Sequence, residues 1–187
     1  MAVIVVSGMP GAGSSTVASL LAKRLNLRHF SAGDFFKKKA VESGVKEGET
    51  RRATEFLLTE RGSRKDFHVD IDDLQRELAK AGNIVIDGKL SIRLLSGLYD
   101  VSVWLKAPDD VRARRISGRD GIPEKEALKA VKERDRIERQ SFLRIYGFDT
   151  FSQENEAGIV VDTSDMTPEE IVNLIVKKMK ESNKKGW

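Results

Sequence analysis

The chain has 187 residues, of which 40% are hydrophobic and 33% charged, with a formal net charge of +4 and no cysteine. This length and composition predict one globular domain, residues 1–187, with a substantial buried core. The absence of cysteine excludes a disulfide framework, thiolate metal ligands and a cysteine nucleophile, and it suits the reducing cytoplasm. No apolar run approaches the length of a membrane span, so we expect a soluble protein without a membrane partner.

Short apolar runs alternate with helical patterns along the chain. Strands are predicted over residues 2–7, 28–31, 83–87, 101–105 and 158–162. Helices are predicted over residues 15–25, 33–43, 67–80, 109–119 and 123–145, and a last helix begins at the capping box Thr167–Glu170. This order predicts an α/β fold in which helices cover both faces of a parallel sheet and ligands bind at the carboxyl ends of the strands. The polar segments near 44–65 and 109–146 are expected to be lids on this core.

The strongest motif lies between the first predicted strand and the first predicted helix. It consists of Gly8, Met9, Pro10, Gly11, Ala12, Gly13, Ser14, Ser15 and Thr16. Glycines allow the positive φ angles that turn backbone N–H groups toward an anion, and the N-terminus of the following helix adds its dipole. We therefore predict a phosphate-binding loop, in which the hydroxyl of Ser15 or Thr16 binds Mg²⁺. The alternative is a plain tight turn.

Ser14 stands where the P-loop pattern has lysine. That lysine would bridge the β- and γ-phosphates of a nucleotide. Without it, either other cations supply the charge or the loop binds nucleotide without rapid turnover.

Two further polar clusters follow predicted strands, so they should lie beside the glycine-rich loop. Lys37 follows the second predicted strand and Lys89 the third, and the two could converge on one anion; the alternative is that both are solvated surface lysines. Asp87 closes the third strand, where a carboxylate can hold Mg²⁺ directly or through water, or serve as an ordinary loop or helix-cap aspartate. His29 and His68 have no partner at ligand spacing and are expected to be structural or surface residues.

Arginines are concentrated between residues 112 and 144. Arg112, Arg115 and Arg119 have the spacing of one helix face, and Arg134, Arg136 and Arg139 follow on the next predicted helix. Positive charge on a mobile lid can stabilise a transferring phosphoryl group, so we expect two or three of these arginines to contact phosphate and the others to be solvated. The alternative is an exposed helix with Arg–Glu pairs. Because the arginines are not interleaved with aromatic residues, a small polyphosphate is favoured over nucleic acid.

Taken together, these motifs resemble the cytidylate kinases, in particular the short archaeal type. The segments GMPGAGSST, SAGDFF, VIDGKL, WLKAPDDVRARRISGRDGI and ERDRIERQSFLRIYG occur in the family's order. The resemblance extends over nearly the whole chain. The resemblance implies a P-loop NTPase fold with a five-stranded parallel sheet. It implies a core of residues 1–43, 82–108 and 147–187, a nucleoside-monophosphate-binding insert near 44–81, and an arginine-rich lid near 109–146.

The same resemblance implies phosphoryl transfer from ATP to CMP or dCMP with Mg²⁺, by a cytoplasmic monomer with small-molecule substrates. The loop Gly8–Thr16 would bind ATP, Ser31 and Gly33 would lie against the acceptor, and the lid side chains Arg115, Arg119, Arg134 and Arg139 would reach the transferring phosphate. Lys37 and Lys89 stand where the family usually has arginine, so we expect weaker geometric control of the acceptor phosphate or a changed acceptor. A kinase for AMP, UMP or a small hydroxyl metabolite, and a non-catalytic nucleotide- or nucleic-acid-binding module, remain as alternatives.

Overall fold

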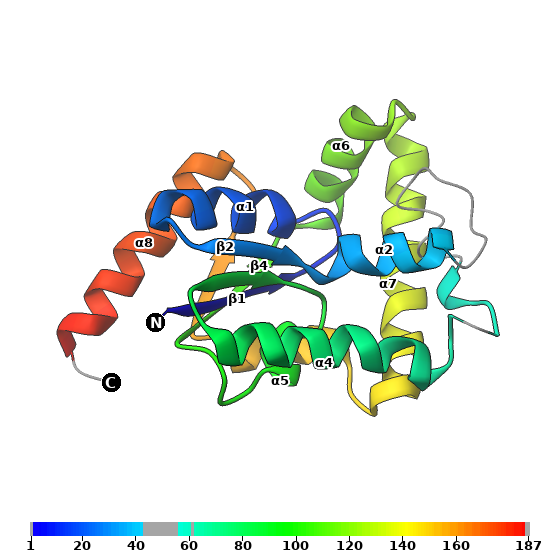
Figure 1. The fold of residues 1–187 in the computed structure, drawn as a ribbon. Helices are drawn as coiled ribbons and strands as arrows, with labels where there is room; N and C mark the ends of the chain where they lie inside the picture. Colours follow the sequence, from blue (N-terminus) through cyan, green and yellow to red (C-terminus); the bar gives the residue numbers. More distant parts are fainter. Residues whose placement is uncertain (1, 43–55, 61, 186–187) are drawn as a thin grey trace.

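The computed structural model describes residues 2–42, 56–60 and 62–185. A five-stranded parallel sheet forms its centre, with the strand order β2-β3-β1-β4-β5 (Figure 1). The strands are β1 (Val3–Gly8), β2 (Arg28–Ser31), β3 (Ile84–Asp87), β4 (Val101–Lys106) and β5 (Ile159–Asp162). The order places the carboxyl end of β1 between those of β3 and β4, so the loop after β1 lies at the middle of the functional edge.

Helices cover both faces of the sheet and its carboxyl edge. They are α1 (Ser14–Leu25), α2 (Ala32–Glu42), α4 (Lys65–Ala81), α5 (Ser91–Leu94), α6 (Asp109–Asp120), α7 (Glu124–Tyr146) and α8 (Pro168–Lys185), and η1 (Thr150–Glu156) is a 3₁₀ helix. Figure 1 shows α1 and α8 over one face, α4 and α5 over the other, and α2, α6 and α7 beyond the ends of the strands. None of the described helices is both long and apolar enough to cross a membrane.

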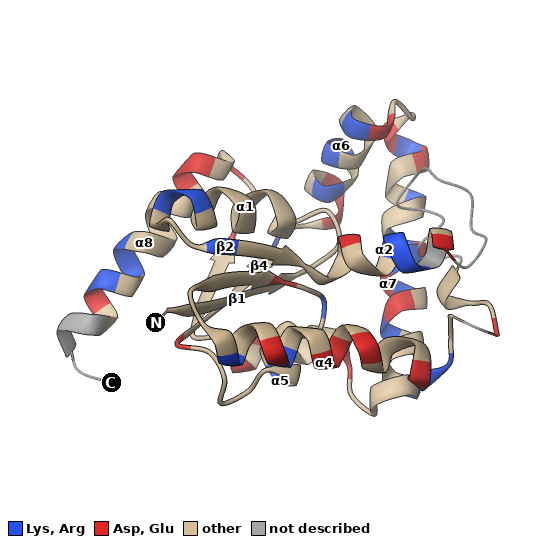
Figure 2. Ribbon diagram, in the orientation of Figure 1, with Lys and Arg blue, Asp and Glu red and all other residues tan. Residues whose placement is uncertain are grey.

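Alternate residues of the strands explain why both faces are covered. Ile4 and Val6 pack with α1 and α8 through residues such as Leu21 and Ile175. Val5, with the other parity, belongs to the second core together with the residues from α4 and α5. Since successive side chains of a strand point to opposite faces, an all-apolar strand needs a helical layer on each side. Figure 2 shows the matching distribution of charge, with Lys, Arg, Asp and Glu mainly on the helices.

The predicted α/β fold with a five-stranded parallel sheet is confirmed. The predicted capping box is also present, since the N–H of Glu170 donates to Thr167 Oγ1 (3.3 Å) and that of Thr167 to Glu170 Oε2 (2.8 Å). The short elements α5 and η1 were not predicted, because they are too brief to show a periodic pattern. The expected end of the 33–43 helix and part of the 44–81 insert lie outside the described residues. The division into core, insert and lid therefore stays a prediction.

Candidate active site

The glycine-rich loop leaves β1 and enters α1 with the backbone that an anion site requires. Gly11 and Gly13 have φ angles of 82° and 95°, in the left-handed region that favours glycine. Gly13 is the N-cap of α1, and no side chain caps that end. The first amide groups of α1 are thus left for a ligand, and the positive end of the helix dipole lies at the same point.

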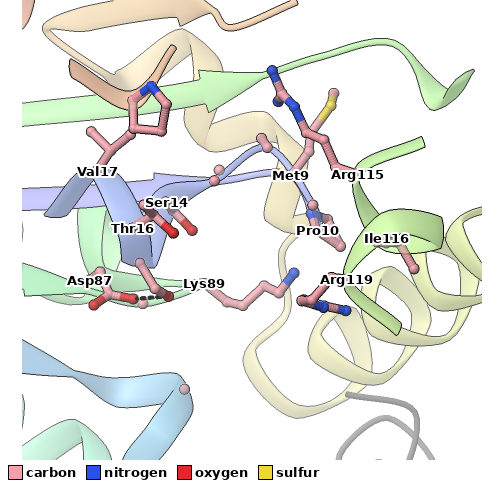
Figure 3. A pocket seen from close by; sticks show the side chains of 18 of the residues that line it. Met9, Pro10, Ser14, Thr16, Val17, Asp87, Lys89, Arg115, Ile116 and Arg119 are labelled. Atoms are coloured by element: carbon pink, nitrogen blue, oxygen red, sulfur yellow. Dashed lines mark hydrogen bonds between the residues drawn. The ribbon is translucent and has the colours of Figure 1, made fainter. Parts of the chain in front are cut away.

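A cavity of about 450 Å³ opens over this loop (Figure 3). Most of the residues singled out from the sequence line it together: Gly8, Met9, Pro10, Gly11, Ala12, Gly13, Ser14, Ser15, Thr16, Gly33, Lys37, Asp87, Lys89, Arg115, Arg119 and Arg134. Ser31 is not in the lining but hydrogen-bonds to one of its members, as described next. The sequence motifs therefore converge on one site at the carboxyl edge of the sheet.

Asp87 is the centre of a hydrogen-bond network beneath the loop. Its side chain is only 4% exposed, yet it accepts hydrogen bonds from Ser15 Oγ (2.8 Å) and Ser31 Oγ (3.2 Å), both on Oδ1. The register that pairs Ser31 with Asp87 across β2 and β3 explains the second contact. The network fixes the carboxylate at the start of α1, beside the backbone N–H groups of the loop.

His29 on β2 completes the network and was missed from the sequence. Its Nε2 lies 2.7 Å from Asp87 Oδ2, and because a carboxylate only accepts hydrogen bonds, the ring nitrogen is the donor. His29 is thus a structural residue, as expected, but its contact with the candidate site was not predicted. The only available signal was its place on a strand two residues before Ser31, and that signal has meaning only once β2 is known to lie beside β3.

The donor set around Asp87 fits a divalent cation with oxygen ligands. Among the described residues there is no group of three or more His, Cys, Asp or Glu that could hold a metal ion. Mg²⁺, however, usually takes only one or two protein ligands and completes its octahedron with water and phosphate oxygens. The neighbouring Ser15 hydroxyl and Asp87 carboxylate suit that requirement, as sites for direct or water-mediated contact.

On the opposite wall, Lys89 and Arg134 share one buried carboxylate. Glu138 on α7 lies 2.5 Å from Lys89 Nζ and accepts a 2.7 Å hydrogen bond from Arg134 Nε. Burial opposes ionisation of Glu138, but Arg134 and Lys89 outweigh it and hold the pKa of the carboxyl below its usual value. Burial lowers the pKa of Lys89 to about 8. Lys37, in contrast, is exposed and pairs with Asp34 at 2.7 Å.

The arginines of α6 point in different directions. Arg115 donates to Thr163 Oγ1 (2.9 Å), after β5, whereas Arg119 is half exposed and pairs with the adjacent Asp120 (2.6 Å). Figure 3 shows Arg119 and Lys89 extending toward each other below the loop, while Arg115 points to the other side. Of the two α6 arginines that line the cavity, Arg119 is thus the one on the side of Lys89.

Arg139, predicted as a lid arginine, is not brought to either cavity at the strand ends. It pairs with Asp149 and lies over the Phe151 ring, 4.8 Å from the centroid. The physical reason is the helix period, because residue 139 lies about 100° around α7 from Glu138, which faces the site. In this arrangement Arg139 holds the start of η1 rather than a phosphate.

Arg112 does not line the phosphate-loop cavity, nor is it solvated as the remaining arginines were expected to be. It is 1% exposed, and its guanidinium binds Asp135 (2.7 Å) on α7, Asp109 (2.6 Å) and the carbonyl of Pro10 (3.1 Å). One side chain thus ties the phosphate loop to both α6 and α7.

Replacing Arg112 with methionine is expected to lower the free energy of unfolding by about 3 kcal/mol, because Asp135 then keeps a poorly solvated charge without its partner. Urea unfolding measures the change. Arg114→Met is the matched control on the same helix, since Arg114 is 60% exposed and should cost less than about 1 kcal/mol. Equal effects of the two substitutions would contradict the assignment.

A second cavity of about 120 Å³ adjoins the first and shares Gly33, Lys37, Lys89 and Arg134 with it. Buried Asp72 on α4 lines this cavity and accepts a hydrogen bond from Tyr146 Oη on α7 (2.8 Å). Burial raises the pKa of Asp72 to about 6, against the lowering effects of the Tyr146 hydrogen bond and the charge of Arg76.

The Asp72 pKa predicts a pH-dependent stability. A carboxyl whose pKa is higher in the folded state contributes most below its unfolded value, near 4, and that contribution is lost as pH rises through about 6. The free energy of unfolding of Asp72→Asn, compared with that of the native protein, should therefore rise by about 2–3 kcal/mol when the pH is raised from 4 to 7.5. Urea unfolding at both pH values measures it. Asp73→Asn, at a 61% exposed position on the same helix, should show almost no such gain.

A parallel sheet, a phosphate loop entering α1 and cationic side chains from α6 and α7 together define a P-loop kinase. Residues 3–165 match the model of the cytidylate kinase-like family, and the chain belongs to this family. It is 40% identical over 181 residues to a cytidylate kinase of Ignicoccus hospitalis, covering 96% of this chain and 99% of that one. It is 35% identical over 176 residues to the cytidylate kinase of Methanocaldococcus jannaschii, covering 92% and 94% of the two chains.

A solved structure supports the fold. The shikimate kinase of Bacteroides thetaiotaomicron superposes with a TM-score of 0.62, covering 96% of this chain and 98% of that one. At 17% identity this likeness concerns the fold alone. The architecture is therefore one that P-loop kinases share, and the acceptor has to be inferred from the family and the site.

Proposed function

We propose that the protein transfers the γ-phosphoryl group of ATP to CMP or dCMP, giving ADP and CDP or dCDP. The observation that carries the proposal is the pair of adjoining cavities, one over the phosphate loop and one beside it, with Lys37, Lys89 and Arg134 at their shared rim. A donor in the first cavity and an acceptor in the second would meet at these cations. The names of the relatives supply the identity of the acceptor base.

The missing P-loop lysine does not leave the cavity without positive charge. Lys89, Arg115 and Arg119 line it in addition to the two other cations at the rim. These side chains can supply the charge that a lysine at position 14 would have given. This favours a catalytic site over a module that only binds nucleotide.

The transfer itself requires little covalent chemistry from the protein. An oxygen of the acceptor phosphate forms a bond to the γ-phosphorus, and the bond from that phosphorus to the β–γ bridging oxygen breaks, leaving ADP. Loop N–H groups would hold the donor phosphates, and Arg119, Lys89 and Arg134 would stabilise the charge of the moving group. Ser15 and Asp87 would hold Mg²⁺, which when bound supplies further charge neutralisation at the phosphates.

The test is an acceptor panel with ATP and MgCl₂, in which ADP formation is measured for CMP, dCMP, UMP, AMP and GMP. We expect CMP or dCMP to give the highest kcat/KM. If only another metabolite accepted phosphate, the assignment to nucleoside monophosphates would be overturned. ATP binding without turnover on any acceptor would point to a non-catalytic module.

We also expect a cytoplasmic monomer. Size-exclusion chromatography with light scattering measures the oligomeric state.

A further inference from the structure

The second cavity, of about 120 Å³, lies beside the phosphate-loop cavity and shares residues with it. Its walls are largely apolar and come from α2, α4, α7, the segment 56–60 and the segment after β3. The apolar contributors are Phe36, Leu57, Ile71, Leu90, Leu94 and Phe142. Its rim is the cationic border shared with the phosphate-loop cavity. On the proposed function, on which this inference rests, an acceptor with its phosphate at that border places its base among these side chains.

Gln75, His68 and Asp72 are polar residues that line this pocket, and they differ in how many of their polar atoms already have hydrogen-bond partners. Gln75 accepts from Ser91 Oγ (2.7 Å) and donates to the carbonyl of Ile71 (3.3 Å), so both ends of its amide are occupied. His68 has its Nε2 at 2.9 Å from the carbonyl of Gly62. Gln75 therefore needs no ligand at either end of its amide, whereas Nδ1 of His68 has no hydrogen-bond partner among the described residues.

Asp72 is the carboxylate of this group, and only one of its two oxygens has a partner. Oδ2 accepts from Tyr146 Oη, and Oδ1 has no hydrogen-bond partner within the part of the chain that the structure describes. The residue is 8% exposed and lines the cavity. An oxygen that has no partner among these residues and is left open toward a cavity can accept a hydrogen bond from a donor on a ligand.

We propose that Asp72, positioned by Tyr146, accepts a hydrogen bond from the exocyclic amino group of the acceptor base and thereby selects cytosine over uracil. Cytosine carries an N4 amino donor, whereas uracil carries an O4 acceptor at the same position. A carboxylate oxygen satisfies the first and repels the second. The discrimination thus has two sources. Cytosine gains a hydrogen bond to Asp72, and uracil places its O4 acceptor against the carboxylate oxygen, which is also an acceptor.

Asp72→Asn tests this, because the amide keeps the shape and changes the hydrogen-bonding pattern. The Tyr146 hydroxyl still donates to the side-chain oxygen, which turns the new NH₂ toward the base. That group opposes the cytosine amine and matches uracil O4. We expect the ratio of kcat/KM for CMP to that for UMP to fall by about 100-fold or more. Tyr146→Phe, which frees the carboxylate to rotate, should lower the ratio to a smaller degree.

Asp73→Asn is the control, since it makes the same change of charge on the exposed side of α4 and should leave the ratio as in the native enzyme. Where turnover of Asp72→Asn is too slow, the Kd values of CMP and UMP from calorimetry give the same ratio. An unchanged ratio, or a native enzyme that uses CMP and UMP equally, overturns this inference while the kinase function stands. If native protein phosphorylates no nucleoside monophosphate, the proposed function itself has failed.

Discussion

Replacing Arg119 with alanine is expected to lower kcat by about 10³-fold, the effect that removal of an arginine from a transferring phosphoryl group has in related chemistry. Arg119 lines the phosphate-loop cavity, extends toward Lys89 and is 52% exposed, so its loss removes charge from the site without opening the core (Figure 3). The free energy of unfolding should change by less than about 1 kcal/mol. Steady-state kinetics at saturating ATP and CMP, together with urea unfolding, measure both quantities.

Arg114→Ala is the matched control for Arg119. It lies on the same helix, is 60% exposed and pairs with Asp110, and it is not among the residues lining the cavity. We expect its kcat to stay within about two-fold of the native value. Similar losses of kcat in the two variants would show that the effect comes from the surface charge of α6 and would remove Arg119 from the site.

The second large effect is expected for Asp87→Asn, which should lower kcat by about 10²-fold or more and raise the Mg²⁺ concentration needed for half-maximal rate. The carboxylate accepts from Ser15, Ser31 and His29, and an amide can accept only at one of its two ends. The substitution thus removes a negative charge beside the proposed cation site and breaks the network that fixes the start of α1. A titration of rate against MgCl₂ measures the effect.

Asp162→Asn provides the comparison for Asp87, because Asp162 ends β5 as Asp87 ends β3 but does not line the cavity. Its Mg²⁺ dependence should equal that of the native enzyme. An Asp87→Asn variant with native kcat and native Mg²⁺ dependence would exclude a role for this carboxylate in holding the cation.

The fold could be predicted from the sequence because its signals are local. Five apolar runs and the helical patterns between them are each contained in a few consecutive residues, and their alternation indicates a parallel sheet. The phosphate loop is equally local, since Gly8–Thr16 needs only its own strand and helix to be recognised. The strand order is not local, and it decides which strand ends lie side by side.

The side-chain contacts that the sequence did not identify all depend on that order or on helix packing. His29 meets Asp87 because β2 lies beside β3, and Asp72 meets Tyr146 because α4 and α7 approach the same cavity. Arg112 has the spacing of a lid arginine, but the neighbouring acidic residues Asp109 and Asp135 draw it into a buried ion pair. Spacing along one helix gives the face on which a residue lies but not what that face meets.

The central claim is that this site moves a phosphoryl group from ATP to CMP, and ³¹P NMR of the native protein with ATP, MgCl₂ and CMP tests it most directly. We expect the signals of CDP and ADP to grow in equal amounts while those of ATP and CMP decline, with no accumulation of inorganic phosphate. Unchanged ATP, or the formation of ADP and inorganic phosphate without CDP, would contradict the account.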